Sequence, residues 1–245
     1  MNGMDLFSGI GGMSAALSEW VRPVAYCEID SYCQAVLLSR MGDSSILPAP
    51  IWPDIRSFPA KSFPQGYVDI IYGGFPCQDV SIAGSKKGLD GERSTLIFDM
   101  LRVANEIRPQ FIFIENVPQI INLGACEIIK EINKMGMDCR WACLSAASCG
   151  APHKRDRWFL LAYNNSKSSS KTYQASKLEP QIGNAWLRYS GLIGRAGPLS
   201  YWQEVQRPVF GMDDGVPNEL DRAKALGNSV VSMQAKKAFK ILMGL

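Results

Sequence analysis

The stretch Met4-Asp5-Leu6-Phe7-Ser8-Gly9-Ile10-Gly11-Gly12 begins as a short apolar strand, turns on glycines, and leads into a helical pattern. Glycines at such a turn let the backbone approach a ligand closely, and the N-terminus of the following helix favours negative charge. The glycines fall as GxGG and not as the GxGxxG of dinucleotide sites. The turn therefore favours a ligand other than a nicotinamide cofactor, although a tight turn also needs glycine for backbone reasons alone.

A carboxylate residue, Glu28, follows the glycine turn in the sequence. Glu28 ends the next apolar run, 17 residues after Gly11, where a carboxylate can accept hydrogen bonds from ribose hydroxyls. The glycine turn and the spaced acid together favour a ligand that contains adenosine. A nucleoside with a short charged tail, such as S-adenosyl-L-methionine, fits this turn without a pyrophosphate.

The chain as far as residue 162 alternates short apolar runs with helical patterns. The predicted strands are Met4–Phe7, Val24–Cys27, Val68–Tyr72, Phe111–Ile114, Arg140–Leu144 and Trp158–Ala162. The predicted helices are Gly12–Trp20, Ser31–Arg40, Thr95–Ile107 and Pro118–Met135. Buried strands separated by helices indicate an α/β protein with a doubly wound, mostly parallel sheet. The last two strands lack a long helix between them and are expected to pair antiparallel at one edge.

Beyond residue 162 the pattern changes. Residues 164–174 are rich in Asn, Ser and Lys and predict a linker, and Ile182–Gln206 mixes Gly and Pro with aromatic residues, as in a small irregular subdomain. Val230–Leu242 returns to a helical pattern. From Tyr163 to Phe210, six basic and two acidic residues give a net charge of +4, against +3 for the whole chain. This patch fits a nucleic-acid partner or a solvated linker.

The cysteine and histidine content bounds the chemistry. The seven cysteines form no CxxC pair and leave one over in any pairing, which favours a reduced, cytoplasmic protein. His153 is the single histidine, so no metal site is expected. No apolar run approaches the ~20 residues that span a bilayer. The N-terminus carries no basic segment followed by an apolar stretch, so neither a membrane segment nor a signal peptide is expected.

Reactive side chains follow several of the predicted strands. Cys77 comes just after the strand that ends in Gly73-Gly74-Phe75-Pro76, in the crevice where α/β sheets bind ligands. A buried, inert cysteine is the alternative. Glu115 leaves an apolar strand, where partial desolvation raises a carboxyl pKa, although an edge carboxylate paired with an arginine fits equally well. Arg155 and Arg157 alternate with other residues at a strand start, so they share one side and could clamp a phosphate or a carbonyl oxygen.

In their order and placement these segments resemble the C5-cytosine-specific DNA methyltransferase family, particularly its compact phage- and plasmid-borne members. The resemblance rests on DLFSGIGG (5–12), CEID (27–30), PDIRSF (53–58), GGFPCQDVSIAG (73–84), IENV (114–117), HKRDRW (153–158) and ALGNSVV (225–231). These blocks cover nearly the whole chain except about residues 163–205.

The resemblance implies three parts and an S-adenosylmethionine-dependent methyltransferase fold. Residues 1–162 would form the catalytic domain, and 163–210 a linker and reduced target-recognition region. Residues 211–245 would complete the catalytic domain, with their helix packed back beside the first strand. The implied substrate is duplex DNA, bound by a monomer.

The resemblance also assigns catalytic roles. Cys77 would add as a thiolate to C6 of a flipped-out cytosine, so that C5 can accept a methyl group. Glu115 would contact N3 and the exocyclic amine, and Arg157, supported by Arg155, would hold the ring O2. Asn116 would orient the loops that carry Glu115 and Cys77.

For the cofactor, the resemblance places the glycine loop around the methionine and sulfonium portion, Glu28 at the ribose and the segment 54–55 at the adenine edge. The implied contacts with S-adenosyl-L-methionine are Phe7, Gly9, Gly11, Gly12, Glu28, Ile29, Asp54, Ile55, Asn228 and Ser229.

The chain departs from the family pattern in three places. Ile29 stands where many relatives carry an aromatic residue that stacks on adenine, and His153 stands where glutamine is usual. The interval from Ala162 to Gly211 is short for a target-recognition domain. A short recognition site read around Trp186–Trp202 is the expected consequence.

Three other functions stay open on the sequence alone. An RNA cytosine methyltransferase could use the same motifs. A non-catalytic nucleic-acid-binding relative would explain the thin recognition region, although Cys77, Glu115 and Arg157 are intact. A cysteine hydrolase would pair Cys77 with His153, but the sequence offers no residue to orient the histidine.

Overall fold

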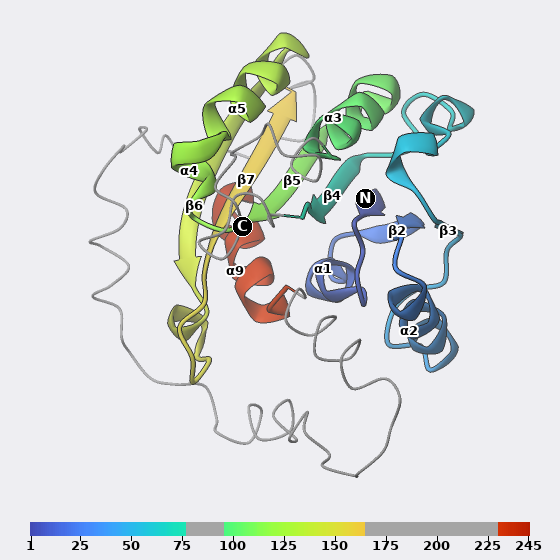
Figure 1. The fold of residues 1–245 in the computed structure, drawn as a ribbon, viewed down its shortest axis with the longest axis horizontal. Coiled ribbons are helices and arrows are strands. Elements are labelled where there is room, and N and C mark those ends of the chain that lie inside the picture. Colours follow the sequence, from blue (N-terminus) through green and yellow to red (C-terminus); the bar gives the residue numbers. More distant parts are fainter. Residues whose placement is uncertain (77–95, 165–229) are drawn as a thin grey trace.

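The computed structural model describes residues 1–76, 96–164 and 230–245. Its centre is one sheet of seven strands in the order β3-β2-β1-β4-β5-β7-β6 (Figure 1). The strands are β1 (Asn2–Leu6), β2 (Arg22–Cys27), β3 (Ile51–Trp52), β4 (Ile70–Gly74), β5 (Phe111–Asn116), β6 (Met137–Ser145) and β7 (Asp156–Asn164). The helices are α1 (Gly12–Leu17), α2 (Ser31–Gly42), α3 (Leu96–Ile107), α4 (Ile120–Leu123), α5 (Ala125–Lys134) and α9 (Ser232–Met243), with 3-10 turns at Ile55–Ser57, Ala60–Ser62 and Ala147–Cys149.

The predicted doubly wound, mostly parallel sheet is confirmed. Strands β3, β2, β1, β4 and β5 run parallel, and β7 pairs antiparallel with both β5 and β6. The expected antiparallel pair therefore lies at one edge. From β1 the chain proceeds to β2 on one side, whereas β4 lies on the other. Because ligands of open α/β sheets bind beyond the carboxyl ends of the strands at this switch point, the ends of β1 and β4 are the expected place for a site.

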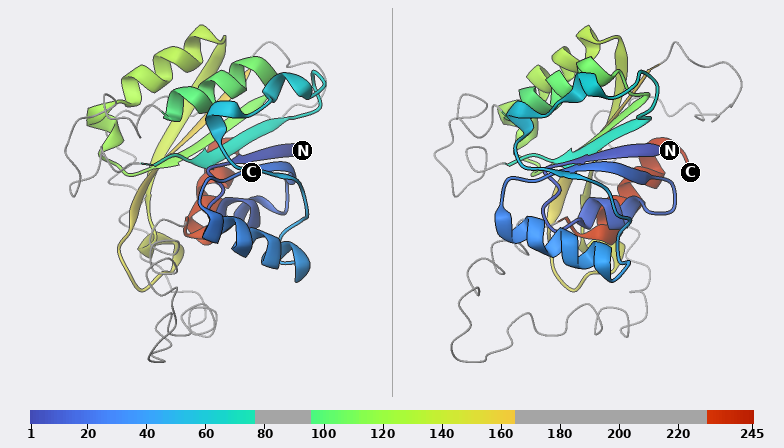
Figure 2. Two further views of the ribbon diagram at one scale, coloured as in Figure 1. Left: turned by 45° about the vertical axis from the view of Figure 1, so that its right-hand side comes forward. Right: turned by 90° about the vertical axis from the view of Figure 1, so that its right-hand side faces the viewer.

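Helices cover both faces of the sheet (Figure 2). Helices α3 and α5 bury apolar side chains against one face, and in α3 Ile97, Met100, Leu101, Ala104 and Ile107 follow the period of an amphipathic helix. Helices α1 and α9 cover the other face around Ile70, Tyr72, Phe113 and Phe239. No helix in the described ranges is both long and apolar enough to cross a membrane.

Some predicted boundaries were wrong, for local reasons. The helix predicted over Gly12–Trp20 ends at Leu17, where a turn brings Trp20 onto Phe239 of α9, with ring centroids 5.5 Å apart. The helix predicted over Pro118–Met135 is two helices, because Gly124 ends α4 and begins α5. Glycine is a weak helix former, and its flexibility permits the break. Strand β3 is two residues long and showed no alternation that a sequence pattern could reveal.

The predicted C-terminal helix is confirmed as α9, but its neighbours differ from the expectation. It was expected beside the first strand, whereas its most extensive contacts are with α1, β6 and β7. Phe239 lies edge-on to Phe113 of β5, with ring centroids 5.2 Å apart. The hydroxyl of Ser232 donates to the carbonyl of Gly12 at 3.1 Å. The C-terminal segment therefore contacts the start of α1, where the glycine turn ends.

The division of the chain at residues 162 and 210 stays a prediction. Strand β7 continues to Asn164. The expected linker, recognition subdomain and aromatic-basic patch lie at 165–229, outside the described residues.

Candidate functional site

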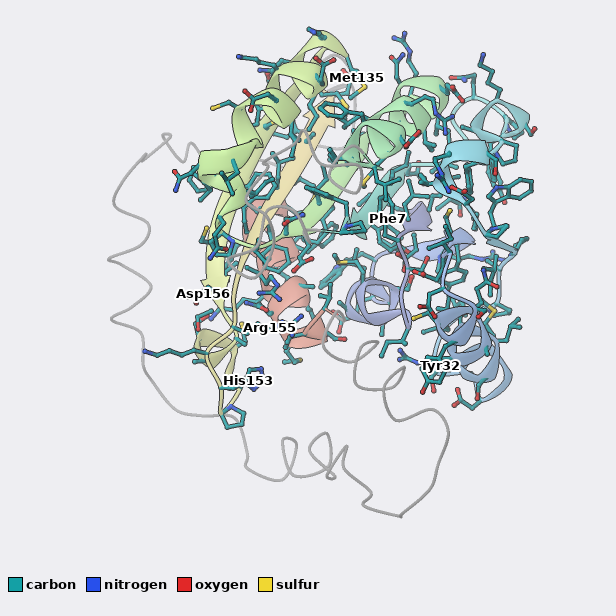
Figure 3. The ribbon with its side chains drawn as sticks, viewed as in Figure 1. Phe7, Tyr32, Met135, His153, Arg155 and Asp156 are labelled. Carbon is teal, nitrogen blue, oxygen red and sulfur yellow. The ribbon has the colours of Figure 1, made fainter. Side chains whose placement is uncertain are left out.

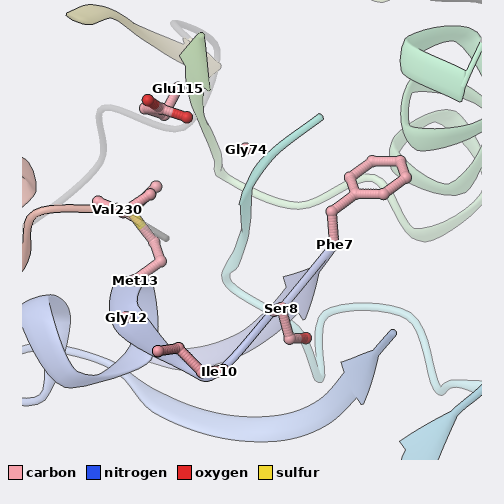
Figure 4. Close-up of a pocket in the computed structure, with 9 residues that line it drawn as sticks. Phe7, Ser8, Ile10, Gly12, Met13, Gly74, Glu115 and Val230 are labelled. Carbon is pink, nitrogen blue, oxygen red and sulfur yellow. The ribbon is translucent and has the colours of Figure 1, made fainter. Parts of the chain in front are cut away.

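A pocket opens at the switch point of the sheet (Figure 4). Three parts of the chain that are far apart in sequence form it: the loop after β1, the ends of β4 and β5, and the segment before α9. Its lining residues are Phe7, Ser8, Gly9, Ile10, Gly12, Met13, Gly74, Glu115 and Val230. In Figure 4, Glu115, Met13 and Val230 lie on one side of Gly74 and Phe7 on the other. The glycine loop and the Glu115 carboxyl, predicted separately, thus share one cavity.

The glycine loop has the backbone that its sequence predicted. Phe7, Gly9 and Gly11 all have positive φ, at 57°, 51° and 81°. A Cβ at Gly11 would press on Leu37 and Ile46, whereas a Cβ at Gly9 would meet nothing within 4 Å. Gly9 therefore borders open space, and its left-handed backbone favours glycine. The loop leaves room for a ligand at that residue.

The carboxylate of Glu28 is tied to this loop. It accepts hydrogen bonds from the backbone N–H of Gly9 at 2.7 Å and of Asp30 at 2.8 Å, one on each oxygen. A carboxylate oxygen has two lone pairs, so each oxygen can accept a further hydrogen bond. Glu28 can thus both fix the loop and receive two hydroxyl groups.

The residues expected at the adenine edge differ in what they offer. Ile29 is 65% exposed and presents a free apolar surface beside Glu28. The side chain of Asp54 accepts from the backbone N–H of Arg56 and pairs with its guanidinium at 2.6 Å, and these contacts lower the Asp54 pKa. Ile55 is buried in the core, so only its backbone could face a ligand. The structure therefore places these three residues at the ends of neighbouring strands.

Glu115 is the chemically most unusual group of the pocket. It is the penultimate residue of β5, whereas the predicted strand ended one residue earlier, at Ile114. In the sheet it lies between Gly74 of β4 and Phe159 of β7. Burial raises the pKa of its carboxyl, and the positive charges of Arg157 and Arg155 oppose this rise. The Nε of Arg157 lies 2.8 Å from Glu115 Oε1. Of the two predicted arginines, Arg157 is thus paired directly with Glu115.

Two neighbours define where this carboxyl lies. A Cβ at Gly74 would come within 2.5 Å of Glu115 Oε2, so the carboxyl occupies space that only glycine leaves open. Asn116, also buried, donates from its side-chain amide to the carbonyl of Phe75 at 3.1 Å. Asn116 therefore links the end of β5 to the backbone two residues before Cys77.

Three of the predicted site residues, Cys77, Asn228 and Ser229, lie outside the described residues. His153 is exposed in the turn between β6 and β7, and Figure 3 shows it nearer the tip of this turn than Arg155. Within the ranges that the structure describes, no group of three or more potential metal ligands occurs.

A buried polar cluster beneath the loop was not predicted. Asp5 is fully buried in β1, and its carboxyl accepts a hydrogen bond of 2.5 Å from Ser14. The Ser14 hydroxyl also lies 2.8 Å from that of Tyr72. Burial raises the pKa of Asp5 to about 8. An acidic residue inside an apolar strand was the available signal in the sequence.

The sheet order and the pocket at its switch point define the S-adenosylmethionine-dependent methyltransferase fold, and solved structures bear this out. The structure is similar to a DNMT2 mutant of Spodoptera frugiperda, with a TM-score of 0.56 and 20% identity over 70% of this chain and 52% of that one. It is also similar to the Dnmt2 methyltransferase of S. pombe, with a TM-score of 0.55 and 24% identity over 75% and 57%.

The sequence comparison is more specific. The profile of the C-5 cytosine-specific DNA methylase family matches residues 1–194, and the chain belongs to this family. It is 34% identical to the type II methyltransferase M.CviJI of Paramecium bursaria Chlorella virus IL3A, over 65% of this chain and 42% of the relative. It is 33% identical to M.HhaI of Haemophilus parahaemolyticus, over 66% and 49%. The chain thus matches about half the length of these relatives. Enzymes of this family and fold use S-adenosylmethionine as the methyl donor.

Proposed function

We propose that this protein transfers a methyl group from S-adenosyl-L-methionine to C5 of a flipped-out cytosine in duplex DNA, with Cys77 as the nucleophile. The observation that carries the proposal is the buried carboxyl of Glu115, which lines one pocket with the glycine loop and with Gly74 of β4, the strand that leads to Cys77. The half-buried Arg157 is paired with this carboxyl. Family membership and the type II methyltransferase relatives support the same reaction.

The residues of the glycine loop fit the proposed cofactor. S-adenosyl-L-methionine supplies an electrophilic methyl group when it is bound. Gly9 leaves open space beside the loop, Glu28 has lone pairs for the two ribose hydroxyls, and Ile29 offers an exposed apolar surface to the adenine. Asn228 and Ser229 are proposed to close the pocket from the segment before α9.

On the substrate side, the Cys77 thiolate would form a bond to C6 of the cytosine and push electron density onto C5, which takes the methyl group. A base would then remove the C5 proton, and the electron pair of that C–H bond would expel the thiolate from C6, which restores the ring. Glu115 is suited to contact N3, because its raised pKa lets it hold a proton against the charge that develops there. Arg157, with Arg155, is proposed to hold the ring O2.

Duplex DNA is the proposed partner of a monomer that works in the cytoplasm without a metal. The type II methyltransferases among the relatives favour DNA over RNA. The proposed recognition element is the aromatic-basic stretch at 186–202, where four aromatic residues could stack on or contact bases. A recognition region of this size predicts a short target sequence.

Expression in a host that lacks cytosine methylation tests the proposal, with Cys77→Ala as the matched control. Bisulfite sequencing of plasmid and chromosome should show protected cytosines in one recurring short context, and none with the control. If every cytosine converts although the wild-type protein is folded and binds S-adenosyl-L-methionine, DNA methylation by this chain is contradicted. Methyl transfer to tRNA in the same extract would then identify an RNA methyltransferase.

A further inference from the structure

The first turn of α9 sends one polar side chain into the interior of the protein. Gln234 is fully buried, on the same helix face as Ala235, Ala238, Phe239 and Leu242. The other buried residues of this helix are all apolar. The Oε1 atom of Gln234 has no hydrogen-bond partner among the described residues. A buried amide with one unsatisfied atom lowers the free energy of unfolding. The presence of Gln234 here therefore suggests that its other hydrogen bonds have a role.

The other two contacts of Gln234 hold the end of β6 and the residue that precedes β7. The Gln234 side-chain nitrogen donates to the carbonyl of Leu144 and to that of Arg155, each at 2.7 Å. Leu144 lies in β6 opposite Arg157, and Arg155 directly precedes β7. Because both partners are carbonyl oxygens, only the amide NH2 group can satisfy them, and both of its N–H bonds are used.

One of the two carbonyl groups belongs to Arg155 itself, and the other belongs to Leu144, the register partner of Arg157. The Arg155 carbonyl also accepts from the backbone N–H of Ala146 at 3.0 Å, so this point ties together the end of β6, the start of β7 and α9. A shift of the backbone here would carry Arg155 and Arg157 away from Glu115. Both arginines lower the pKa of the Glu115 carboxyl, Arg157 more strongly than Arg155.

We propose that Gln234 is a positioning residue, which holds the start of β7 so that Arg155 and Arg157 face Glu115 in the reacting geometry. This inference rests on the proposed function for its catalytic consequence. The part of it that concerns the geometry of Glu115 stands without that function. The C-terminal helix would then contribute to the cytosine side of the pocket as well as to the cofactor side.

Gln234→Met tests this inference, because methionine fills a similar volume and donates no hydrogen bond. We expect kcat for DNA methylation to fall by about ten- to a hundredfold, with KM for S-adenosyl-L-methionine unchanged. We also expect the Glu115 pKa to rise, because the arginines that lower it would retreat. The titration can be followed by NMR with 13C-carboxyl glutamate, in which Glu115→Gln assigns the signal. Gln234→Leu, which also donates no hydrogen bond, should lower kcat and raise the Glu115 pKa in the same way, and it replaces Gln234→Met if that variant does not fold.

The matched control is Lys236→Met. Lys236 also anchors α9, but its contact is an ion pair with Glu19 at the end of α1 and not with β6 or β7. This control should change neither kcat nor the Glu115 titration. The inference is overturned if Gln234→Met leaves the Glu115 titration unchanged. It is also overturned if Gln234→Met and Lys236→Met both lose activity in proportion to their loss of stability. If the wild-type protein methylates no DNA, the proposed function fails, and the Glu115 titration still decides the role of Gln234.

Discussion

The Glu115 carboxyl shows how single residues set the chemistry of the pocket. It lies inside the sheet rather than at the end of a strand, and burial raises its pKa while Arg157 and Arg155 lower it. The Glu115 side chain also lies close to Gly74, where a Cβ would collide with the Glu115 Oε2 atom. Glycine is therefore required at position 74 because it leaves space for the Glu115 carboxyl from the neighbouring strand.

Gly74→Ala should displace the Glu115 carboxyl without unfolding the protein, because the atom that must move is the end of a flexible side chain. We expect kcat for methyl transfer to drop by about tenfold or more, with little change in the urea midpoint. Steady-state kinetics and urea unfolding measure the two effects. Gly42→Ala is the matched control, because a Cβ at Gly42 meets nothing within 4 Å. Unchanged kinetics in Gly74→Ala would contradict the account of this contact.

The raised pKa of Asp5 predicts that the stability of the fold depends on pH. Its folded-state pKa is raised from 3.8 to about 8, so the unfolded chain loses the proton first as the pH rises. Between about pH 4 and 8, folding stability should therefore fall with rising pH, by up to about 1.4 kcal/mol per pH unit from this group, and level off above it. Asp5→Asn mimics the protonated form and should remove most of this slope. Urea midpoints at pH 5, 6.5 and 8 measure it, and equal slopes in both proteins would refute the assignment.

At the scale of elements, the sequence predicted what periodicity can encode. Apolar runs and amphipathic spacing correctly indicated the parallel strands, the antiparallel edge pair and the C-terminal helix. The apolar periodicity predicted one continuous helix over Pro118–Met135, whereas Gly124 divides it into α4 and α5. Strand β3 has only two residues, which are too few to form a pattern. Gln234 resembled an ordinary polar position of α9, and only its contacts with β6 and β7 set it apart. Contacts between distant elements leave no periodic signal in the sequence.

Helix α9 should be essential for stability through its aromatic anchor. Phe239 is fully buried between Trp20 and Phe113, so Phe239→Ala should lower the free energy of unfolding by about 3–5 kcal/mol. Urea denaturation followed by circular dichroism gives this value. Met233→Ala, at an exposed position of the same helix, should cost far less. A loss below about 1 kcal/mol for Phe239→Ala would show that the helix is not anchored there.

At the scale of the whole molecule, the switch point of the sheet brings the two halves of the proposed reaction together. The loop after β1 and the end of β4 meet there, and Val230 completes the pocket from the C-terminal segment. The resemblance in sequence anticipated this convergence, because its motifs follow the family order from residue 5 to residue 231. Target recognition by the stretch 186–202 stays a prediction, because it rests on the aromatic and basic composition of that stretch.

A suicide substrate can trap the covalent adduct that we propose between Cys77 and the target cytosine. In a duplex oligonucleotide with 5-fluorocytosine at the target position, the C5 substituent cannot leave as a proton, so the thiolate cannot be expelled after methyl transfer. We expect the wild-type protein to form a complex with this duplex that survives denaturation. Intact mass spectrometry should find protein, oligonucleotide and one methyl group in it. Cys77→Ala should form no such complex. If the wild-type protein methylates the ordinary duplex but forms no such complex, the proposed mechanism through Cys77 is wrong.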